Sequence, residues 1–353
     1  MRITAILLLL VFAHTIPANA QGDLEFRIGA RVPVELPPLF QRGAKFLVES
    51  QKEDGSWKAQ SSFGSNGTGV TSLCILALMS TGEDPNFGPY ARSVRSGLEY
   101  LIRKQNAKSG LPGGNAYDFG FTLLAMAEAY GAIDEDLMFA GEKVGGRRTL
   151  GEALELAVKG ACTMKHKTEL VGHAWNSTAG NGGIPDTSVG GSVLVGLLAA
   201  RNAGIEVSDD VMKRAMKYFQ KMTNKSGTVG YFQTRGNDYG NSIARSSITA
   251  LVLAIGKRKT CKEYASTAKY ISTNLEMRYQ THPLYGDYYQ AQALFQVDYK
   301  AWQNWNRERV RQIVLLANDD GSIARSPVGP AYSTAMSMLT LALNYRFLPI
   351  YER

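Results

Sequence analysis

Two kinds of apolar pattern alternate along this chain of 353 residues. In the first kind, apolar or small residues recur at i, i+3, i+4, i+7, i+8 and i+11, which places them on one face of an α-helix. The clearest case is the run Leu36, Leu39, Phe40, Gly43, Ala44 and Leu47. In the second kind the segment is apolar nearly all round, as in Val70–Met79 and Val189–Ala200. A helix with one apolar stripe covers a core, and a helix that is apolar on all sides lies inside one. The alternation therefore predicts outer helices wrapped around inner helices.

The two patterns form six pairs. We predict outer helices at 36–50, 91–104, 148–163, 208–222, 261–276 and 299–316, and inner helices at 68–81, 117–131, 187–203, 241–256, 287–297 and 331–347. The inner segments begin roughly 45 to 70 residues apart, a spacing typical of repeat architectures. Six antiparallel helix pairs can close into a ring that leaves no end to be capped. We therefore expect an all-α (α/α)6 toroid over residues 36–353, with an open solenoid as the alternative.

The first 20 residues have the pattern of a secretory signal peptide. Arg2 supplies a positive charge, Ile3–Ala13 is apolar, and Ala18–Ala20 has the small residues of a cleavage site. The apolar stretch is too short to span a bilayer, and no later segment approaches about 20 apolar residues. We expect export to a periplasm or to the outside, with an uncleaved anchor as the alternative. Residues 21–35 would then form an irregular N-terminal arm ahead of the toroid.

The net charge is +8, and it falls to +7 after cleavage because residues 1–20 contain Arg2 and no acidic residue. The basic residues are spread along the chain, so we expect no nucleic-acid partner. Cys74, Cys162 and Cys261 are too widely spaced for a metal knuckle, and their odd number does not fit a disulfide scaffold. Each is expected to be a small buried apolar residue of a helix. No metal and no cofactor is predicted.

The link after the first outer segment reads Gln51-Lys52-Glu53-Asp54-Gly55-Ser56-Trp57. Asp54-Gly55 suits a turn with positive φ, Gln51 can satisfy free groups at a helix end, and Trp57 is a large buried anchor. This link resembles the QW repeat of squalene and oxidosqualene cyclases, which is related to the repeat of protein prenyltransferase β-subunits. Weaker copies are found at 318–323, 108–110 and 225–227. The resemblance implies an α/α toroid whose ligand sites lie at the end where the inner helices begin.

The C-terminal third has a more particular resemblance. Tyr288–Gln296, Trp302, Trp305-Asn306 and Asn344–Tyr351 resemble segments of exported bacterial proteins with prenyltransferase/squalene-oxidase repeats, which are common in planctomycete-type bacteria. This resemblance implies an architecture and no particular reaction.

The hallmark residues of the best-known toroid enzymes are missing. Triterpene cyclases protonate an alkene with the middle acid of a D-x-D-D-T motif, and aligning Asp186-Thr187 on that motif places Pro185 at the proton donor. Asp186 is better interpreted as the N-cap of the helix that begins at Thr187. Protein prenyltransferases coordinate zinc with one Asp, one Cys and one His. The resemblance would require such a set, and this sequence has none that matches the family's pattern. Cyclisation by the usual route and zinc chemistry are therefore not expected.

Helical toroids also host carbohydrate-active hydrolases and lyases, which need placed carboxylates in a groove lined by aromatic residues. Carboxylates near the predicted starts of inner helices are Asp118, Asp186, Asp238 and Asp287. Aromatic residues near them are Tyr117, Trp175, Tyr239, Tyr285, Tyr288, Tyr289 and Tyr332. Each aspartate could instead be a helix N-cap, and each tyrosine could simply pack in the core. If the ring closes, these residues gather at one mouth of the toroid, which is our candidate ligand-binding site.

Three functions remain open. The absence of every tested catalytic signature favours an exported toroid that binds an unknown ligand or protein partner at this mouth. A divergent isoprenoid enzyme similar to squalene or terpenoid cyclases would need an acid other than Pro185 and a dry aromatic cavity. A carbohydrate-active lyase or hydrolase would need a wet groove with two carboxylates roughly 5–10 Å apart.

Overall fold

Twelve α-helices alternate between an outer and an inner layer in the described part of the chain. The computed structural model describes residues 32–60, 67–113, 116–139, 148–164, 175, 185–232, 242–323 and 326–351. The outer helices are α2 (Leu36–Glu49), α4 (Ala91–Lys104), α6 (Leu150–Thr163), α8 (Asp209–Met222), α10 (Lys262–Thr273) and α12 (Tyr299–Val314). The inner helices are α3 (Thr68–Met79), α5 (Ala116–Ala129), α7 (Thr187–Asn202), α9 (Ile243–Ile255), α11 (Pro283–Val297) and α13 (Pro330–Leu341). Three short 3-10 helices are η1 (Glu135–Leu137), η2 (Ala342–Asn344) and η3 (Pro349–Tyr351). The predicted signal peptide lies outside the described residues.

The two layers differ in burial as the apolar patterns predict. In α2 the buried residues are Leu36, Leu39, Phe40, Gly43, Ala44 and Leu47, the same six that form its apolar stripe. In α3 every residue from Thr68 to Leu78 is buried. An outer helix therefore contributes one face to the core, whereas an inner helix lies within it.

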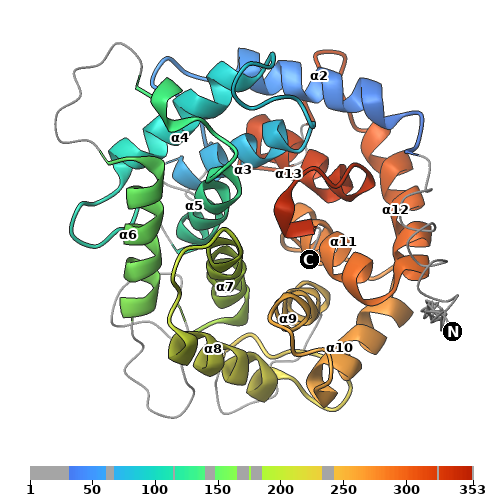
Figure 1. The fold of residues 1–353 in the computed structure, drawn as a ribbon. Helices are drawn as coiled ribbons and strands as arrows, with labels where there is room; N and C mark the ends of the chain where they lie inside the picture. The colour runs from blue at the N-terminus through green and yellow to red at the C-terminus, as the bar shows by residue number, and fades with distance from the viewer. Residues whose placement is uncertain are drawn as a thin grey trace, which may run out of the picture. The chain divides into compact units, whose positions relative to one another are not determined.

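The inner helices form a closed ring. Each contacts the next in the order α3, α5, α7, α9, α11 and α13, and α13 contacts α3 again. The outer helix α2 contacts both α3 and α13, so it covers the junction between the last pair and the first (Figure 1). Residues Glu35–Arg353 make up one compact unit by their contacts. The fold is thus the predicted all-α toroid, and the open solenoid is excluded.

Small residues allow α5 and α7 to approach closely. A Cβ added to Gly120 of α5 would lie 2.8 Å from the Ser192 carbonyl carbon of α7. In the reverse direction, a Cβ at Gly196 would lie 2.9 Å from Cβ of Leu123 and 3.1 Å from the Gly120 oxygen. Side chains larger than hydrogen at these positions would push the two backbones apart.

One tight turn recurs at four links between an outer and an inner helix. Gly55, Gly110, Gly227 and Gly321 have φ between +74° and +88°. A Cβ at any of them would lie 2.1 to 2.3 Å from a backbone oxygen of the next outer helix, α4, α6, α10 and α2 respectively. The oxygen facing Gly321 belongs to Arg42, so the last turn of the chain packs on its first helix. Glycine is needed here both for the backbone conformation and for the close contact.

Two tryptophans satisfy carbonyl groups at the ends of outer helices. The indole Nε1 of Trp57 donates to the Leu47 oxygen at 2.7 Å, and that of Trp175 donates to the Ala161 oxygen at 3.1 Å. Each acceptor lies two residues before the last residue of its helix, where carbonyl groups lack a partner within the helix. Trp175 therefore occupies the place in the third pair that Trp57 occupies in the first.

Gln51 of the first link does not cap the end of α2, contrary to our prediction. The Gln51 amide donates to the Gly55 oxygen in its own turn and to the Ser93 oxygen of α4, both at 2.9 Å. Gln105 makes the same bridge in the second pair, where it donates to Ala153 of α6 at 2.7 Å. The glutamines thus join one repeat to the next. In the first pair, the end of α2 is satisfied by the Trp57 indole instead.

Some predicted boundaries need correction. Helix α11 begins at Pro283, four residues before the predicted start at 287, because proline fits the first position of a helix. We predicted an inner helix that reaches residue 347. Helix α13 ends earlier, at Leu341, and the 3-10 helix η2 follows it. Cys74 is buried as predicted, but Cys162 and Cys261 are only partly buried.

Candidate functional site

The N-terminal end of α7 holds a buried carboxyl group. Asp186 is 1% exposed, and its Oδ1 accepts a hydrogen bond from the Val189 amide at 2.6 Å. This is the N-cap arrangement that we predicted for Asp186. The strand-like segment before α9 holds the residue in place, because Asp186 pairs with Phe232 and the Thr187 amide donates to the Tyr231 oxygen at 3.1 Å.

Burial controls the protonation of this carboxyl. Desolvation raises the pKa of Asp186 to about 6, although hydrogen bonds from the Val189 and Ser188 amides and the charge of Arg245 lower it. Arg245 of α9 is 7% exposed and donates from Nε to the Val229 oxygen at 2.9 Å. The site therefore combines a buried acid and a buried cation from neighbouring inner helices.

Phenol groups surround this pair. The guanidinium of Arg245 lies 5.4 Å from the centre of the Tyr231 ring, within the range of a cation–π contact. The Tyr231 phenol is hydrogen bonded to Tyr117 of α5, and both side chains are partly exposed. Burial and the nearby charge of Asp186 raise the pKa of both phenols, so they remain protonated donors at neutral pH. We call Tyr117, Asp186, Tyr231 and Arg245 the mouth cluster.

Aromatic side chains from opposite helices fill the space beside the mouth cluster. Tyr285 of α11 donates from its hydroxyl to the Ser188 oxygen at 3.0 Å, and its ring meets the Tyr117 ring edge-on at 5.8 Å between centres. Tyr289 lies 4.8 Å from Tyr285 by the same measure. Helices α5 and α11 lie across the ring from each other, so these rings span the inside of the barrel.

Two more predicted site residues belong to the same aromatic group. The ring of Tyr288 lies 4.8 Å from Tyr289 and 6.3 Å from Phe121 of α5, measured between centres. Tyr332 of α13 is 4% exposed and lies close enough to Tyr289 to affect its pKa. These tyrosines are buried, whereas Tyr117 and Tyr231 are partly exposed, so the aromatic group extends from the mouth cluster into the core.

The structure does not bring Asp118 or Asp287 into the mouth cluster. Asp287 is paired with Arg278 and with Arg309 of α12, whose Nε lies 3.5 Å from Oδ1. Asp118 is 4% exposed and packs against Gly69 of α3, where an added Cβ would lie 3.1 Å from the Asp118 Cα. Neither residue is an N-cap, because α11 and α5 begin four and two residues earlier. Both aspartates are therefore buried where helices contact each other or the segments beside them.

The two remaining predicted residues have different outcomes. Trp175 is 2% exposed and its indole satisfies the end of α6, so it acts in the framework of the repeat. Tyr239, like Asp238, lies outside the described residues.

Sequence reasoning missed Arg245 and Tyr231. Arg245 had a usable signal, because a charged residue inside a helix that is apolar all round is almost never buried without a partner. Tyr231 had no such signal in the sequence. It lies in the link before α9, and this link comes next to Asp186 only when the helix pairs have assembled into the ring.

Two further observations on the described residues concern metal binding and membrane-spanning helices. No group of three or more His, Cys, Asp or Glu side chains among them is placed to hold a metal ion. None of the helices there is both long enough and apolar enough to cross a membrane.

Known structures share this fold at low sequence identity. The type II terpene cyclase MstE from Scytonema, in its apo form, has a TM-score of 0.59 and 15% identity over 89% of this chain and 99% of that one. The GH76A α-1,6-mannanase from Salegentibacter sp. HEL1_6 has a TM-score of 0.63 and 11% identity over 88% and 99%. At these identities the likeness concerns the fold alone.

The family can be assigned from sequence. No curated protein matches the chain. A family model matches residues 38–346, which is nearly the whole toroid. The chain belongs to the family described as Domain of unknown function (DUF6288).

Proposed function

We propose that this chain is an exported toroid protein that binds a ligand at the mouth cluster. The observation that carries the proposal is the buried pair of Asp186 and Arg245, with Tyr117 and Tyr231 partly exposed beside it. A carboxyl, a guanidinium and two phenols offer donors and an acceptor beside a group of aromatic side chains. Ligand sites typically combine an apolar wall with a few polar groups of this kind.

The ligand that suits the mouth cluster has a flat or apolar body and a polar group. Tyr117, Tyr285 and Tyr289 supply ring faces and edges, which favour contact with an extended apolar or cyclic surface. The polar group would interact with Arg245 and the Tyr231 phenol. Isoprenoid and carbohydrate ligands both have such features, and a protein partner could present an aromatic side chain in the same way.

A second candidate is a proton-transfer enzyme that uses Asp186 as its acid. The raised pKa of Asp186 favours this candidate, because a carboxyl with a pKa of about 6 remains partly protonated near neutral pH. Glycoside hydrolysis has less support, since it needs two carboxylates facing one substrate. In the described residues, Asp118 and Asp287 instead pack against a neighbouring helix and two arginines.

Export is part of the proposal and rests on the sequence pattern of residues 1–20. It can be tested by expressing the full chain in a Gram-negative bacterium and sequencing the N-terminus of the accumulated protein. We expect a periplasmic product that begins at Gln21. A cytoplasmic product that retains Met1 would contradict export.

Binding is tested by mass spectrometry of small molecules that co-purify with the mature protein. The comparison is between the wild type and the double variant Tyr117→Phe, Asp186→Asn, which removes one phenol and the ionisable carboxyl while it keeps the volume of both side chains. We expect a molecule that is retained by the wild type and lost from the variant. A retained isoprenoid would favour the terpenoid-enzyme alternative, and a retained glycan the carbohydrate alternative.

A matched control separates this site from the rest of the surface. Tyr130→Phe with Asp320→Asn makes the same two chemical changes at a residue after the end of α5 and in an exposed turn. The control should retain the molecule. Equal retention by both double variants would mean that the mouth cluster is not the binding site.

A further inference from the structure

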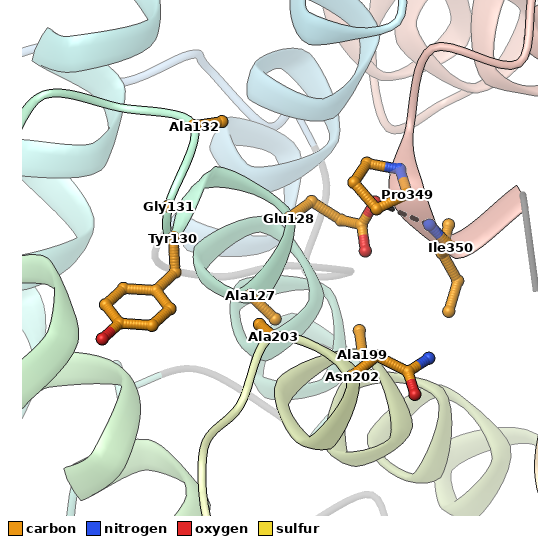
Figure 2. A pocket seen from close by; sticks show the side chains of 10 residues that line it. All are labelled: Ala127, Glu128, Tyr130, Gly131, Ala132, Ala199, Asn202, Ala203, Pro349 and Ile350. Carbon is orange, nitrogen blue, oxygen red and sulfur yellow. Dashed lines mark hydrogen bonds between the residues drawn. The ribbon is translucent and has the colours of Figure 1, made fainter.

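The end of the barrel opposite to the mouth cluster is formed by the links that lead from each inner helix to the next outer helix. A pocket of about 260 Å³ lies at this end, between the last turns of α5 and α7 and residues Pro349 and Ile350 (Figure 2). We call this end the far face, and it comprises the links at 80–90, 130–139, 203–208 and 256–261 and the segment 345–350. We propose that the far face is an interface between two copies of this chain, in which the acidic side of each copy contacts the basic side of the other.

The acidic side consists of the links that follow α3 and α5. The exposed charged residues of 80–90 and 130–139 are all acidic, namely Glu83, Asp84, Asp134 and Asp136. The two links are fixed to each other, because the Asn86 side chain donates to the Ala132 oxygen at 2.9 Å and accepts from the Asp134 amide at 2.7 Å. The neighbouring link at 203–208 adds one more exposed acid, Glu206. This side of the far face therefore carries a continuous negative charge in its described residues.

The basic side is the link from α9 to the first residue of α10. Its charged residues are all basic and all exposed, namely Lys257, Arg258, Lys259 and Lys262. Helices α3 and α9 are three steps apart in the ring of six inner helices, so their links lie on opposite sides of the far face (Figure 1). Positive and negative charge are thus separated across this end of the barrel.

The backbone of the basic link would favour a glycine. Helices α3, α5 and α7 are each followed within three residues by a glycine with positive φ, Gly82, Gly131 and Gly204, whereas α9 is followed by Lys257 at +58°. A left-handed backbone is costly for a residue with a Cβ. The attraction of a lysine to the end of a helix offsets only part of that cost. A basic side chain kept in a strained position indicates a role other than folding.

The two charged sides make the far face complementary to itself. A two-fold axis in the plane of contact can place the acidic side of each copy over the basic side of the other. Opposite charges then attract and fix the register, whereas a different rotation of one copy would bring like charges together. The mouth clusters lie at the two outer ends of such a dimer, so both remain open.

Two exposed aromatic rings add apolar surface to the far face. Phe87 is 81% exposed and Phe347 is 51% exposed. Phe347 is held in place, because its ring stacks on Tyr345 with 5.7 Å between centres and packs on Gly82, where an added Cβ would lie 2.4 Å from the ring. Aromatic residues are enriched at protein interfaces. The far face thus offers apolar contacts beside its charges.

The first test is sedimentation velocity of the mature protein at two salt concentrations. We expect a dimer at micromolar protein concentration in about 10 mM salt, where charges act over about 30 Å. In about 1 M salt that distance falls to about 3 Å, and the dissociation constant of the dimer should rise at least about tenfold. A protein that remains monomeric at high micromolar concentration in low salt, or a dimer that does not respond to salt, would overturn the proposal.

Charge reversal locates the interface. One variant reverses the acidic side by Glu83→Lys with Asp136→Lys, and the other reverses the basic side by Arg258→Glu with Lys262→Glu. Each variant alone sets like charges against each other, so it should be monomeric where the wild type is a dimer. An equimolar mixture should associate, because opposite charges then meet at both contacts. No association of the mixture, although thermal unfolding shows that both variants are folded, would contradict the proposed interface.

A matched control tests whether the position of the charges matters. Glu53→Lys with Asp319→Lys makes the same two changes in exposed turns at the mouth end of the barrel. This control should form dimers as the wild type does. Loss of dimers in the control as well as in the acid-reversed variant would show that overall charge, and not the far face, governs association. If one reversed variant does not fold, the other variant and the salt dependence of the wild type still decide.

Discussion

The state of the Asp186 carboxyl depends on a competition between burial and its hydrogen bonds. An N-cap position and a nearby arginine stabilise the charged form, yet the side chain is almost completely removed from water. Desolvation is the largest effect, and it places the pKa at about 6 against an ordinary value of 3.8. Folding therefore favours the protonated carboxyl, which makes this residue a source of pH-dependent stability.

We predict the sign of that dependence. Because the pKa is higher in the folded state, Asp186 contributes stability that is fully present below pH 3.8 and lost as the pH rises through about 6. The loss is about 3 kcal/mol, since each unit of pKa difference corresponds to about 1.4 kcal/mol. In urea unfolding, the free energy of unfolding of the wild type should therefore fall by about 3 kcal/mol relative to that of Asp186→Asn, which keeps a good N-cap and does not titrate, between about pH 4 and about pH 7.5.

A control at another aspartate should behave in the opposite way. Hydrogen bonds from Ser322 lower the pKa of Asp320, so its contribution is present at neutral pH and is lost as the pH falls through that lowered value. If the difference between wild type and Asp186→Asn were the same at all pH values, the carboxyl would not have the proposed environment.

Single residues also show where sequence reasoning succeeds and where it stops. Asp186 could be recognised as an N-cap because the cap and the amides it binds lie within four residues of each other. The partners of Asp287 are Arg278 and Arg309, and the second of these is on another helix. An N-cap is a local feature, whereas a buried ion pair depends on which helices meet, and spacing along the chain does not contain that information.

At the scale of elements, the turns are more regular in structure than in sequence. The four turn glycines share a backbone conformation and a close contact with the next outer helix. The first turn carries Trp57 after its glycine, while the turn of Gly321 carries Ile323 in the same place, and both residues are 1% exposed. The backbone geometry is therefore the repeated feature, and the side chain after it can vary as long as it is apolar and buried. For this reason the sequence predicted the helix pairs well but ranked the later turns as weak copies.

Gly55 and Gly131 form a matched pair for testing the turn. Both have positive φ, +88° and +82°, but a Cβ at Gly55 would lie 2.1 Å from the Ser96 oxygen, whereas at Gly131 nothing lies within 4 Å. Gly131→Ala should cost about 1–2 kcal/mol of stability, the usual cost of a left-handed backbone for alanine. Gly55→Ala should cost at least about 1 kcal/mol more, because the turn must move away from α4. Equal losses in urea unfolding would show that the contact with α4 does not constrain this turn.

For the whole toroid, closure of the ring makes each helix pair depend on two neighbours. The last turn packs on α2 through Gly321, and α13 packs on α3. A closed ring has no terminal repeat that can separate first at little cost, in contrast to a linear repeat protein. Closure was expected from the number of pairs, but only the contact between first and last elements distinguishes a ring from a solenoid.

This closure predicts how a defect at the junction spreads. Gly321→Ala places a methyl group 2.3 Å from the Arg42 oxygen and should destabilise the whole ring. Hydrogen exchange should then show reduced protection of α7, on the opposite side of the ring, by the same free energy as the loss measured in urea unfolding. Unchanged protection of α7, with faster exchange confined to α2 and α13, would mean that the pairs unfold independently.

The central claim is that the mouth cluster binds the ligand of this protein. The most direct measurement is the dissociation constant of the molecule retained by the wild type, determined by titration into ligand-free wild type, Asp186→Asn, Tyr117→Phe and the control Tyr130→Phe. We predict that each mouth variant weakens binding about tenfold, as expected for the loss of one hydrogen bond to a charged or buried group, and that Tyr130→Phe does not change it. Undiminished binding by both mouth variants would contradict the claim.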